Sequence, residues 1–203
     1  MKKLTRNFYR KDGLTLAKEL LGKVIIHKTE HGVIKGIITE TEAYMGIIDK
    51  ASHAYGSLRS NRTETMYHDG GTSYVYLIYG MYYCMNVIAN KKDIPEAVLI
   101  RGIHPYDKTS LKIMKELRKT DKIKNLCNGP GKLCIAMDID KSLDDVDMCA
   151  PGAKLYIADA GIEINDACIL KGPRINIDYA EEAAAFPWRF YLSQSYINTI
   201  SDI

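Results

Sequence analysis

Three short stretches between residues 40 and 86 bring together two carboxylates, one histidine and six tyrosines. They are Glu40-Thr41-Glu42-Ala43-Tyr44, Ala51-Ser52-His53 and the tyrosine-rich residues 74 to 86. An ionised carboxylate such as that of Glu42, placed at the end of a strand, can take a proton from water. Flat aromatic rings around it can hold a planar, electron-poor group. The combination predicts a site where water attacks beside a bound planar group.

One glycine-rich segment suggests phosphate binding. Gly129-Pro130-Gly131-Lys132 looks like part of a nucleotide-binding loop, but Leu133 stands where a serine or threonine should follow the lysine. The sequence therefore argues against a nucleoside triphosphate site. Two interpretations stay open for this segment: a structural turn, or a helix N-terminus whose N–H groups contact a phosphate.

Metal and cofactor binding find no support in the residue spacing. The acidic residues between positions 138 and 147 lack the glycine and the final glutamate of a calcium loop, so we expect a solvated acidic surface. The histidines have no metal-ligand spacing, and the five cysteines contain no Cys-x-x-Cys pair. We expect no metal, no cofactor and free thiols.

Composition is typical of one globular domain. The 203 residues are 46% hydrophobic and 26% charged, so we expect a single domain covering residues 1–203. The apolar runs are far shorter than a membrane span, and no apolar stretch follows the charged N-terminus. These features favour a cytoplasmic protein without membrane contact. The net charge of +3 permits nucleic-acid binding without requiring it.

Hydrophobic periodicity and turn residues predict strands and helices that do not alternate regularly. The expected strands are residues 23–29, 33–43, 73–79, 82–88, 96–103, 153–158 and 174–177. The expected helices are residues 14–21, 111–118 and 132–137, with residues 183–189 helical or irregular. A hairpin should turn at Gly80-Met81. We therefore predict an α+β fold: a mixed, mostly antiparallel sheet with a protruding β-hairpin and surrounding helices.

Five lysines recur at intervals of four and three residues along the second expected helix. They are Lys108, Lys112, Lys115, Lys119 and Lys122. The stripe is either a solvated helix face or a surface that contacts a phosphate backbone.

These motifs together identify a resemblance. From about residue 10 to about residue 196, the chain resembles the alkyladenine (3-methyladenine) DNA glycosylases of the methylpurine type. The matching pieces are the segments around Glu42, His53 and Tyr76, together with Leu99-Ile100-Arg101, residues 126–134, Gly172-Pro173-Arg174-Ile175 and Arg189-Phe190-Tyr191. Their order and spacing are maintained across most of the chain.

The resemblance implies a role for each matching residue. Glu42 would activate water, and Arg101 and the backbone carbonyl of Ile175 would help to hold it. Tyr44 and His53 would stack on one face of a flipped-out base, and Tyr76 on the other. Tyr79, at the hairpin tip, would fill the gap left in the DNA, while Asn86 would screen the base edge. From their positions, Glu40 is expected to be a structural acid, and Tyr74 and Tyr82 framework residues.

The implied activity is hydrolysis of the N-glycosidic bond of a damaged purine in double-stranded DNA, with water as the nucleophile. No lysine lies inside the three motifs, so no lyase step is expected. Arg101 should lower the pKa of Glu42 and offset the rise that burial causes. A monomer suits an enzyme that scans DNA. The alternative is a nucleic-acid-binding module of the same fold that has lost catalysis.

Overall fold

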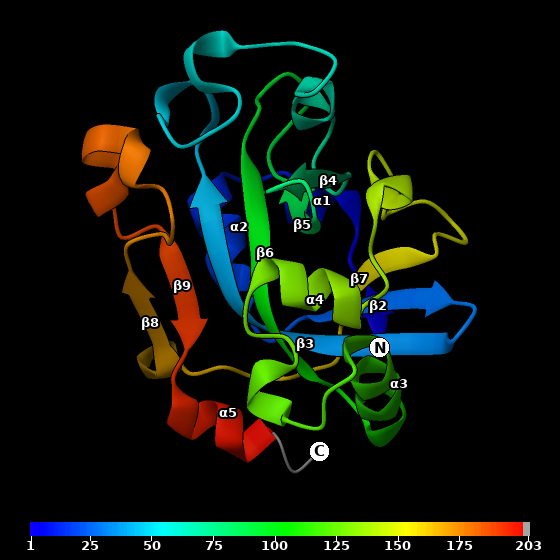
Figure 1. The fold of residues 1–203 in the computed structure, drawn as a ribbon. Helices are drawn as coiled ribbons and strands as arrows, with labels where there is room; N and C mark the ends of the chain where they lie inside the picture. Colours follow the sequence, from blue (N-terminus) through cyan, green and yellow to red (C-terminus); the bar gives the residue numbers. More distant parts are fainter. Residues whose placement is uncertain (201–203) are drawn as a thin grey trace.

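A long curved strand, β3 (Gly32–Tyr44), joins two parts of the sheet in the computed structural model, which describes residues 1–200. Along one edge, the first half of β3 pairs with β2 (Val24–Thr29) and its last residues pair with β9 (Arg189–Leu192). Along the other edge it pairs with β6 (Ala97–Pro105). The end of β3, which carries Glu42, is therefore enclosed by strands from distant parts of the sequence (Figure 1).

The remaining elements complete a nine-stranded sheet and its helical covering. The other strands are β1 (Lys2–Lys3), β4 (Ser73–Ile78), β5 (Tyr82–Ile88), β7 (Leu155–Asp159) and β8 (Ile169–Gly172). The α-helices are α1 (Arg6–Tyr9), α2 (Gly13–Glu19), α3 (Lys108–Arg118), α4 (Pro130–Ala136) and α5 (Gln194–Ile200). Strand order is β1-β7-β2-β3-β6-β5-β4, with β9 and then β8 added beside β3, and every pair in residues 1–200 is antiparallel. The α+β prediction is confirmed.

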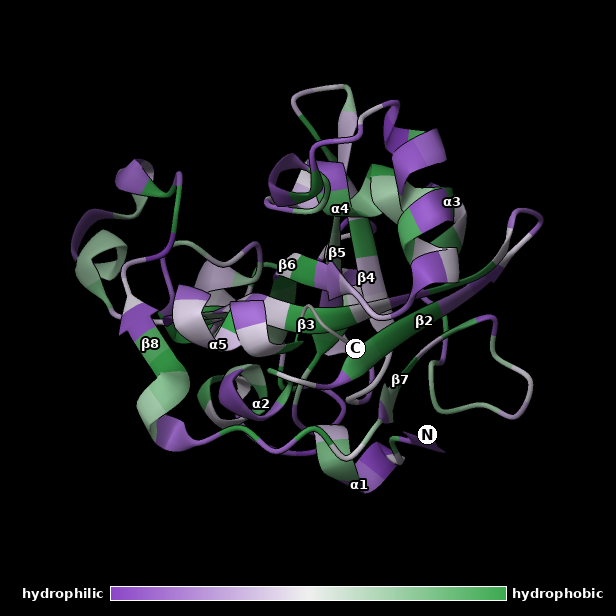
Figure 2. Cartoon of the chain, turned by 90° about the horizontal axis from the view of Figure 1, so that it is seen from below, coloured by the Kyte–Doolittle hydropathy of each residue, from purple (hydrophilic) through white to green (hydrophobic). Residues whose placement is uncertain are grey.

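Helices cover both faces of the sheet. Figures 1 and 2 show α2 on one face and α3 with α4 on the other. Leu16 and Leu20 from the α2 region and Met114 and Leu133 from the opposite layer are fully buried. Each helix is amphipathic, so burying its apolar stripe against the sheet drives the packing. Within residues 1–200, no helix combines the length and apolar composition needed to cross a bilayer.

An irregularity in the β3–β6 pairing lies directly beside the acidic residues. The register shifts between Ile38 and Glu40 and again between Glu40 and Thr41, and Arg101 of β6 has no paired residue on β3. Bulges of this kind bend a strand and redirect side chains, and they are frequent next to active sites. Here the irregular segment carries both Glu40 and Arg101. The simple alternation expected from the sequence does not predict it.

The β4–β5 hairpin turns one residue earlier than expected. Met81 N–H donates to the carbonyl of Ile78 at 3.2 Å, so the central residues of the turn are Tyr79 and Gly80. Both have positive φ, 53° and 68°, which is the backbone of a tight hairpin turn and suits glycine at the second position. The predicted turn at Gly80-Met81 is thus wrong by one residue. The hairpin also packs against α4, where a Cβ on Gly131 would lie 3.0 Å from Tyr82.

Most other expected elements exist, but the C-terminal part differs. Residues 174–177 are not a strand; instead β8 precedes them and β9 follows, and residues 178–185 form the 3₁₀ segment η7 (Asp178–Ala185). The lysine stripe does not continue along α3, because the helix ends at Arg118 and Lys119 is left-handed, with φ of 50°. The expected domain extended to residue 203, and its last three residues lie outside the described part.

Candidate active site

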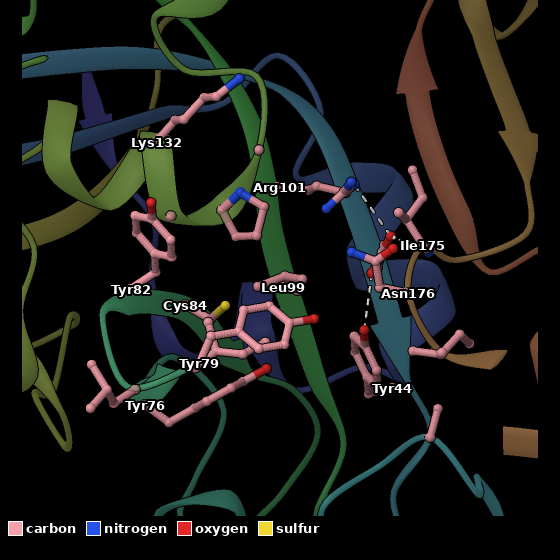
Figure 3. A pocket seen from close by; sticks show the side chains of 18 of the residues that line it. Tyr44, Tyr76, Tyr79, Tyr82, Cys84, Leu99, Arg101, Lys132, Ile175 and Asn176 are labelled. Atoms are coloured by element: carbon pink, nitrogen blue, oxygen red, sulfur yellow. Dashed lines mark hydrogen bonds and ion pairs between the residues drawn. The ribbon is translucent and has the colours of Figure 1, made fainter. Parts of the chain in front are cut away.

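A cavity of about 660 Å³ opens beside the end of β3. Its walls come from β3, β6, the β4–β5 hairpin, the start of α4 and residues 175–179 (Figure 3). The cavity collects every predicted site residue except Asn86, namely Glu42, Tyr44, His53, Tyr76, Tyr79, Arg101 and Ile175. Residues distant in sequence therefore converge on one enclosed space, as the motifs predicted.

Glu42 is fully buried, with its carboxylate facing three donors. The Ile175 N–H donates to Oε1 at 3.0 Å, and the Tyr44 hydroxyl donates to Oε2 at 2.9 Å. Arg101 Nε lies 3.4 Å from Oε1. Figure 3 shows Tyr44, Arg101 and Ile175 along the same stretch of β3. The structure places the N–H of Ile175, not its carbonyl, at the carboxylate.

Burial raises the pKa of Glu42, and it does so more strongly than Arg101, the Ile175 N–H and the Tyr44 hydroxyl lower it. The expectation that Arg101 offsets burial is therefore correct in direction, but the offset is incomplete. A carboxylate with a raised pKa is a stronger proton acceptor than an exposed glutamate. These surroundings suit a general base.

Glu40 connects two guanidinium groups beside Glu42. Its Oε1 lies 3.1 Å from Arg101 Nε and accepts a hydrogen bond from Arg189 Nη1 at 3.1 Å. Despite these distances, Arg101 Nε is buried and makes no aligned hydrogen bond with any group in residues 1–200. These contacts fit the structural role expected for Glu40, which stays a prediction. The Nε of Arg101 faces the carboxylates of Glu40 and Glu42 and is shielded from solvent.

Arg174, a residue with no role predicted from the sequence, holds the segment that carries Ile175. Its guanidinium forms an ion pair with Asp49 in which both side chains are fully buried. The same group lies over the rings of Tyr44 and Trp188, at 4.8 and 4.9 Å from their centroids. One face of Tyr44 is thus covered by a cation. The only signal in the sequence was the position of Arg174 beside Ile175.

On the other side of the cavity, His53 and Tyr76 contact each other. Their ring centroids are 4.7 Å apart with an interplanar angle of 68°, and His53 Nδ1 lies 2.9 Å from the Tyr74 hydroxyl. Burial, helped by the positive charge of Arg62, lowers the pKa of His53 to about 4. The imidazole is therefore neutral near neutral pH. A base can enter between His53 and Tyr76 only if one of the rings turns aside.

Asn86 lies outside the main cavity. It lines a smaller one of about 20 Å³, which shares Tyr44, His53 and Tyr76 as walls. Its Nδ2 donates to the carbonyl of Tyr74 at 3.1 Å, across the β4–β5 pair. The amide therefore sits behind the aromatic wall. Its role in screening a base edge stays a prediction.

The remaining tyrosines of the β4–β5 hairpin differ in solvent exposure. Tyr74 is buried, as expected for a framework residue. Tyr82 was expected to be one too, but it is 42% exposed and lines the cavity. Tyr79, in the turn, is 72% exposed. Strand β4 is thus buried at Val75, whereas the hairpin is open to solvent at its tip.

Besides Arg101, three positive side chains line the cavity, from a loop, from the end of α3 and from α4. They are Arg62, Arg118 and Lys132. Lys132 Nζ donates to Asn128 Oδ1 at 3.0 Å, so the Gly129-Pro130-Gly131-Lys132 segment borders the cavity. None of the five lysines in the stripe that begins at Lys108 lines the cavity. Within residues 1–200 no cluster of histidine, cysteine or acidic side chains could hold a metal ion.

Comparison with known proteins identifies the family. The family model described as "Methylpurine-DNA glycosylase (MPG)" matches residues 7–196. Three relatives, each named "Putative 3-methyladenine DNA glycosylase", match along almost their whole length. The protein from Desulfitobacterium hafniense strain Y51 is 47% identical over 201 residues, covering 96% of this chain and 97% of its own. That from Clostridium perfringens strain SM101 is 49% identical (95% and 97% covered), and that from Clostridioides difficile strain 630 is 48% identical (93% and 100% covered). The chain belongs to the methylpurine-DNA glycosylase family and is a DNA glycosylase.

Proposed function

We propose that this DNA glycosylase flips an alkylated or deaminated purine out of double-stranded DNA and hydrolyses its N-glycosidic bond. The product is an abasic site. The observation that supports this most strongly is the buried Glu42 carboxylate, which meets Arg101, Tyr44 and the Ile175 N–H at the edge of an aromatic cavity. A base-binding wall and a water-activating group then face the same space.

Loss of a purine passes through a transition state with positive charge on the sugar. The ionised carboxylate of Glu42 would stabilise that charge and take a proton from the attacking water. Arg101, which lines the cavity beside this carboxylate, would help to hold the water. Tyr44 and the Ile175 N–H would keep the carboxylate in place during the step.

The aromatic wall suits damaged purines of two kinds. Bases alkylated at N3 or N7, such as 3-methyladenine and 7-methylguanine, carry positive charge, which a tyrosine face attracts by about 0.5–2 kcal/mol. A neutral His53 avoids repelling such a base. Neutral lesions such as hypoxanthine and ethenoadenine gain stacking, about 1–3 kcal/mol per base. The relatives' names support 3-methyladenine as one substrate.

A monofunctional reaction without a lyase step fits the groups around Glu42. A lyase needs an amine that forms a Schiff base with the sugar. One lysine outside the three motifs does line the cavity: Lys132, whose amine is hydrogen-bonded to Asn128. We assign Lys132 to DNA binding. Borohydride should therefore trap no covalent complex with wild-type protein, and trapping that disappears in Lys132→Ala would overturn this assignment.

The enzyme would act as a monomer in the cytoplasm, on chromosomal DNA, without a cofactor. The decisive experiment is base-release profiling on duplexes containing methylated purines or hypoxanthine, in the presence of a chelator. Release of 3-methyladenine with an intact abasic strand supports the proposal. Tight duplex binding without release from any substrate would instead indicate the alternative, a binding module that has lost catalysis.

A further inference from the structure

A second exposed tyrosine borders the cavity, on an element that the sequence motifs do not include. Tyr179, in η7, is 69% exposed and lines the cavity together with the hairpin residue Tyr79, which is 72% exposed. Both rings hold large apolar surfaces in water at the entrance of one pocket. Exposed aromatics grouped around a cavity indicate a surface that a ligand covers.

The backbone around Tyr179 is anchored, so its exposure is not a consequence of a loose segment. Ile177 and Ala180 on either side are buried, and Ala180 N–H donates to the Ile177 carbonyl at 2.9 Å. Asn176, the residue before Ile177, has a left-handed backbone, with φ of 60°. The chain thus makes a tight turn between buried anchors and presents Tyr179 outward.

Tyr179 lines the same cavity as Tyr79 of the hairpin tip and Tyr76 of the aromatic wall. Burial of part of its phenol raises the pKa of Tyr179, and Tyr79 adds a smaller contribution in the same direction. The phenol of Tyr179 therefore stays protonated at neutral pH.

Charges differ between the two sides of the entrance. One side carries Arg118 at the end of α3 and Lys132 in α4. The η7 side carries the acidic residues Asp178, Glu181 and Glu182, the last two paired with Lys50. Phosphate groups will be attracted to the positive side and repelled from η7. Tyr179 consequently faces the uncharged part of a nucleotide.

We propose that Tyr179 is a second aromatic DNA contact, whose ring packs against the apolar face of a base or deoxyribose at the cavity entrance, opposite the hairpin tip. The inference rests on the proposed function, because only an enzyme acting on a flipped nucleotide brings DNA to this entrance. The contact uses the ring and not the hydroxyl group. It is independent of salt, unlike the phosphate contacts of the positive side.

The test measures binding of a duplex containing an abasic-site analogue across a range of salt concentrations. Tyr179→Ala should weaken binding roughly 5- to 100-fold, the range measured for single aromatic–base contacts. The slope of log Kd against log salt should stay unchanged, and Tyr179→Phe should restore binding to within about twofold. In contrast, Lys132→Ala should reduce that slope by about 1.

Two controls keep the result interpretable. Tyr55 is 46% exposed but does not line the cavity, so Tyr55→Ala should bind the duplex normally. The melting temperature of Tyr179→Ala should lie within about 2 °C of wild type, since truncating an exposed side chain costs little.

Each other outcome overturns a defined statement. Normal duplex binding by Tyr179→Ala overturns the ring contact, and so does weak duplex binding by Tyr179→Phe. If Tyr179→Phe binds weakly and also has a smaller slope of log Kd against log salt, the hydroxyl group contacts a phosphate. If the wild-type protein binds the duplex but releases no purine, the proposed function fails and the Tyr179 contact is still decided by the binding data. If wild-type protein binds no duplex, the contact itself is refuted.

Discussion

Two regions of the same cavity are built in opposite ways. The catalytic corner, formed by Glu40, Glu42, Arg101, Arg174 and Ile175, lies on bulged strand ends and on a loop fixed by a buried ion pair. Its acids and guanidinium groups contact one another inside the protein. The cavity mouth, formed by Tyr79, Tyr82 and Tyr179, lies on the hairpin tip and on η7 and presents its side chains to solvent.

The difference reflects what each region must do. Groups that stabilise a transition state act best when they are held in place before the substrate arrives, and buried networks provide that order. Groups that enter DNA must instead be exposed in the free protein, and turns allow this at little cost to folding. Substitutions in the corner and at the mouth should therefore change different measurements.

The largest effect is expected from Glu42→Gln, which removes the base and keeps the shape. Purine release should become undetectable, while binding to an abasic-site duplex stays within a few fold of wild type. The measurement is single-turnover base release next to binding on the same preparation. Release at more than roughly a tenth of the wild-type rate would move the base role elsewhere, with Glu40 the first candidate.

The same variant should not be less stable than wild type at neutral pH. Folding raises the pKa of Glu42, so its contribution to stability is fully present below the unfolded pKa and is lost as pH rises through the folded one. At neutral pH the buried charge is a cost, which glutamine removes. The gain should shrink as the pH falls toward 4.5, the ordinary value for glutamate. Thermal melts across pH measure this, and a constant difference would contradict it.

The next largest effect concerns stability. Arg174→Met leaves the fully buried Asp49 without its partner and should destabilise the protein by about 3–5 kcal/mol. Arg59→Met is the matched control, because Arg59 also forms carboxylate ion pairs, with Glu64 and Asp93, but on the surface. Denaturant unfolding of both variants decides the comparison. If the two midpoints shift equally, the Arg174–Asp49 pair does not anchor the catalytic corner.

A smaller, pH-dependent effect separates the two neighbours of Glu42. Arg101 lowers the pKa of Glu42 and Glu40 raises it. Removing one or the other side chain should therefore shift the acidic limb of the pH–activity profile in opposite directions. Because Glu42 must be ionised, Arg101→Ala should lose activity at a higher pH than wild type, and Glu40→Gln at a lower one. Profiles of release rate against pH measure both. If the acidic limb of the pH profile lies at the same pH in both variants as in wild type, ionisation of Glu42 does not produce that limb.

The sequence predicted which residues line the cavity better than it predicted the irregular segments that hold them in place. Motif residues such as Glu42, Tyr76 and Arg101 were recognisable because the reaction restricts residue type and spacing, and they do share one cavity. The bulge beside Glu40 was not predictable, since it depends on pairing with β6 and leaves no mark on the hydrophobic pattern. A cavity residue on an irregular segment, Tyr179, had no motif to mark it.

Errors in the C-terminal part share a physical cause. Residues 174–177 have the composition of a strand, but the burial of Arg174 against Asp49 and the left-handed backbone of Asn176 prevent sheet pairing. The strand instead forms at β9, where Arg189 lies opposite Glu42 in the register with β3 and forms an ion pair with Glu40. Long-range charge pairing overrides local propensity here, and a single sequence does not show which charges meet.

The smallest effect on the folded protein is expected at the mouth, from Tyr79→Ala. Because Tyr79 is 72% exposed, its truncation should change the melting temperature by no more than about 2 °C, whereas a buried aromatic would cost about 3–5 kcal/mol. If the ring fills the gap left by a flipped nucleotide, release from duplex DNA should fall about tenfold or more, in line with the loss of one stacking contact. Release from a single strand, where no gap opens, should change little. Measuring melting temperature and both release rates on one preparation tests this directly. Equal losses of release rate on duplex and single strand would place Tyr79 in base binding. A large drop in melting temperature would mean that Tyr79 supports the hairpin.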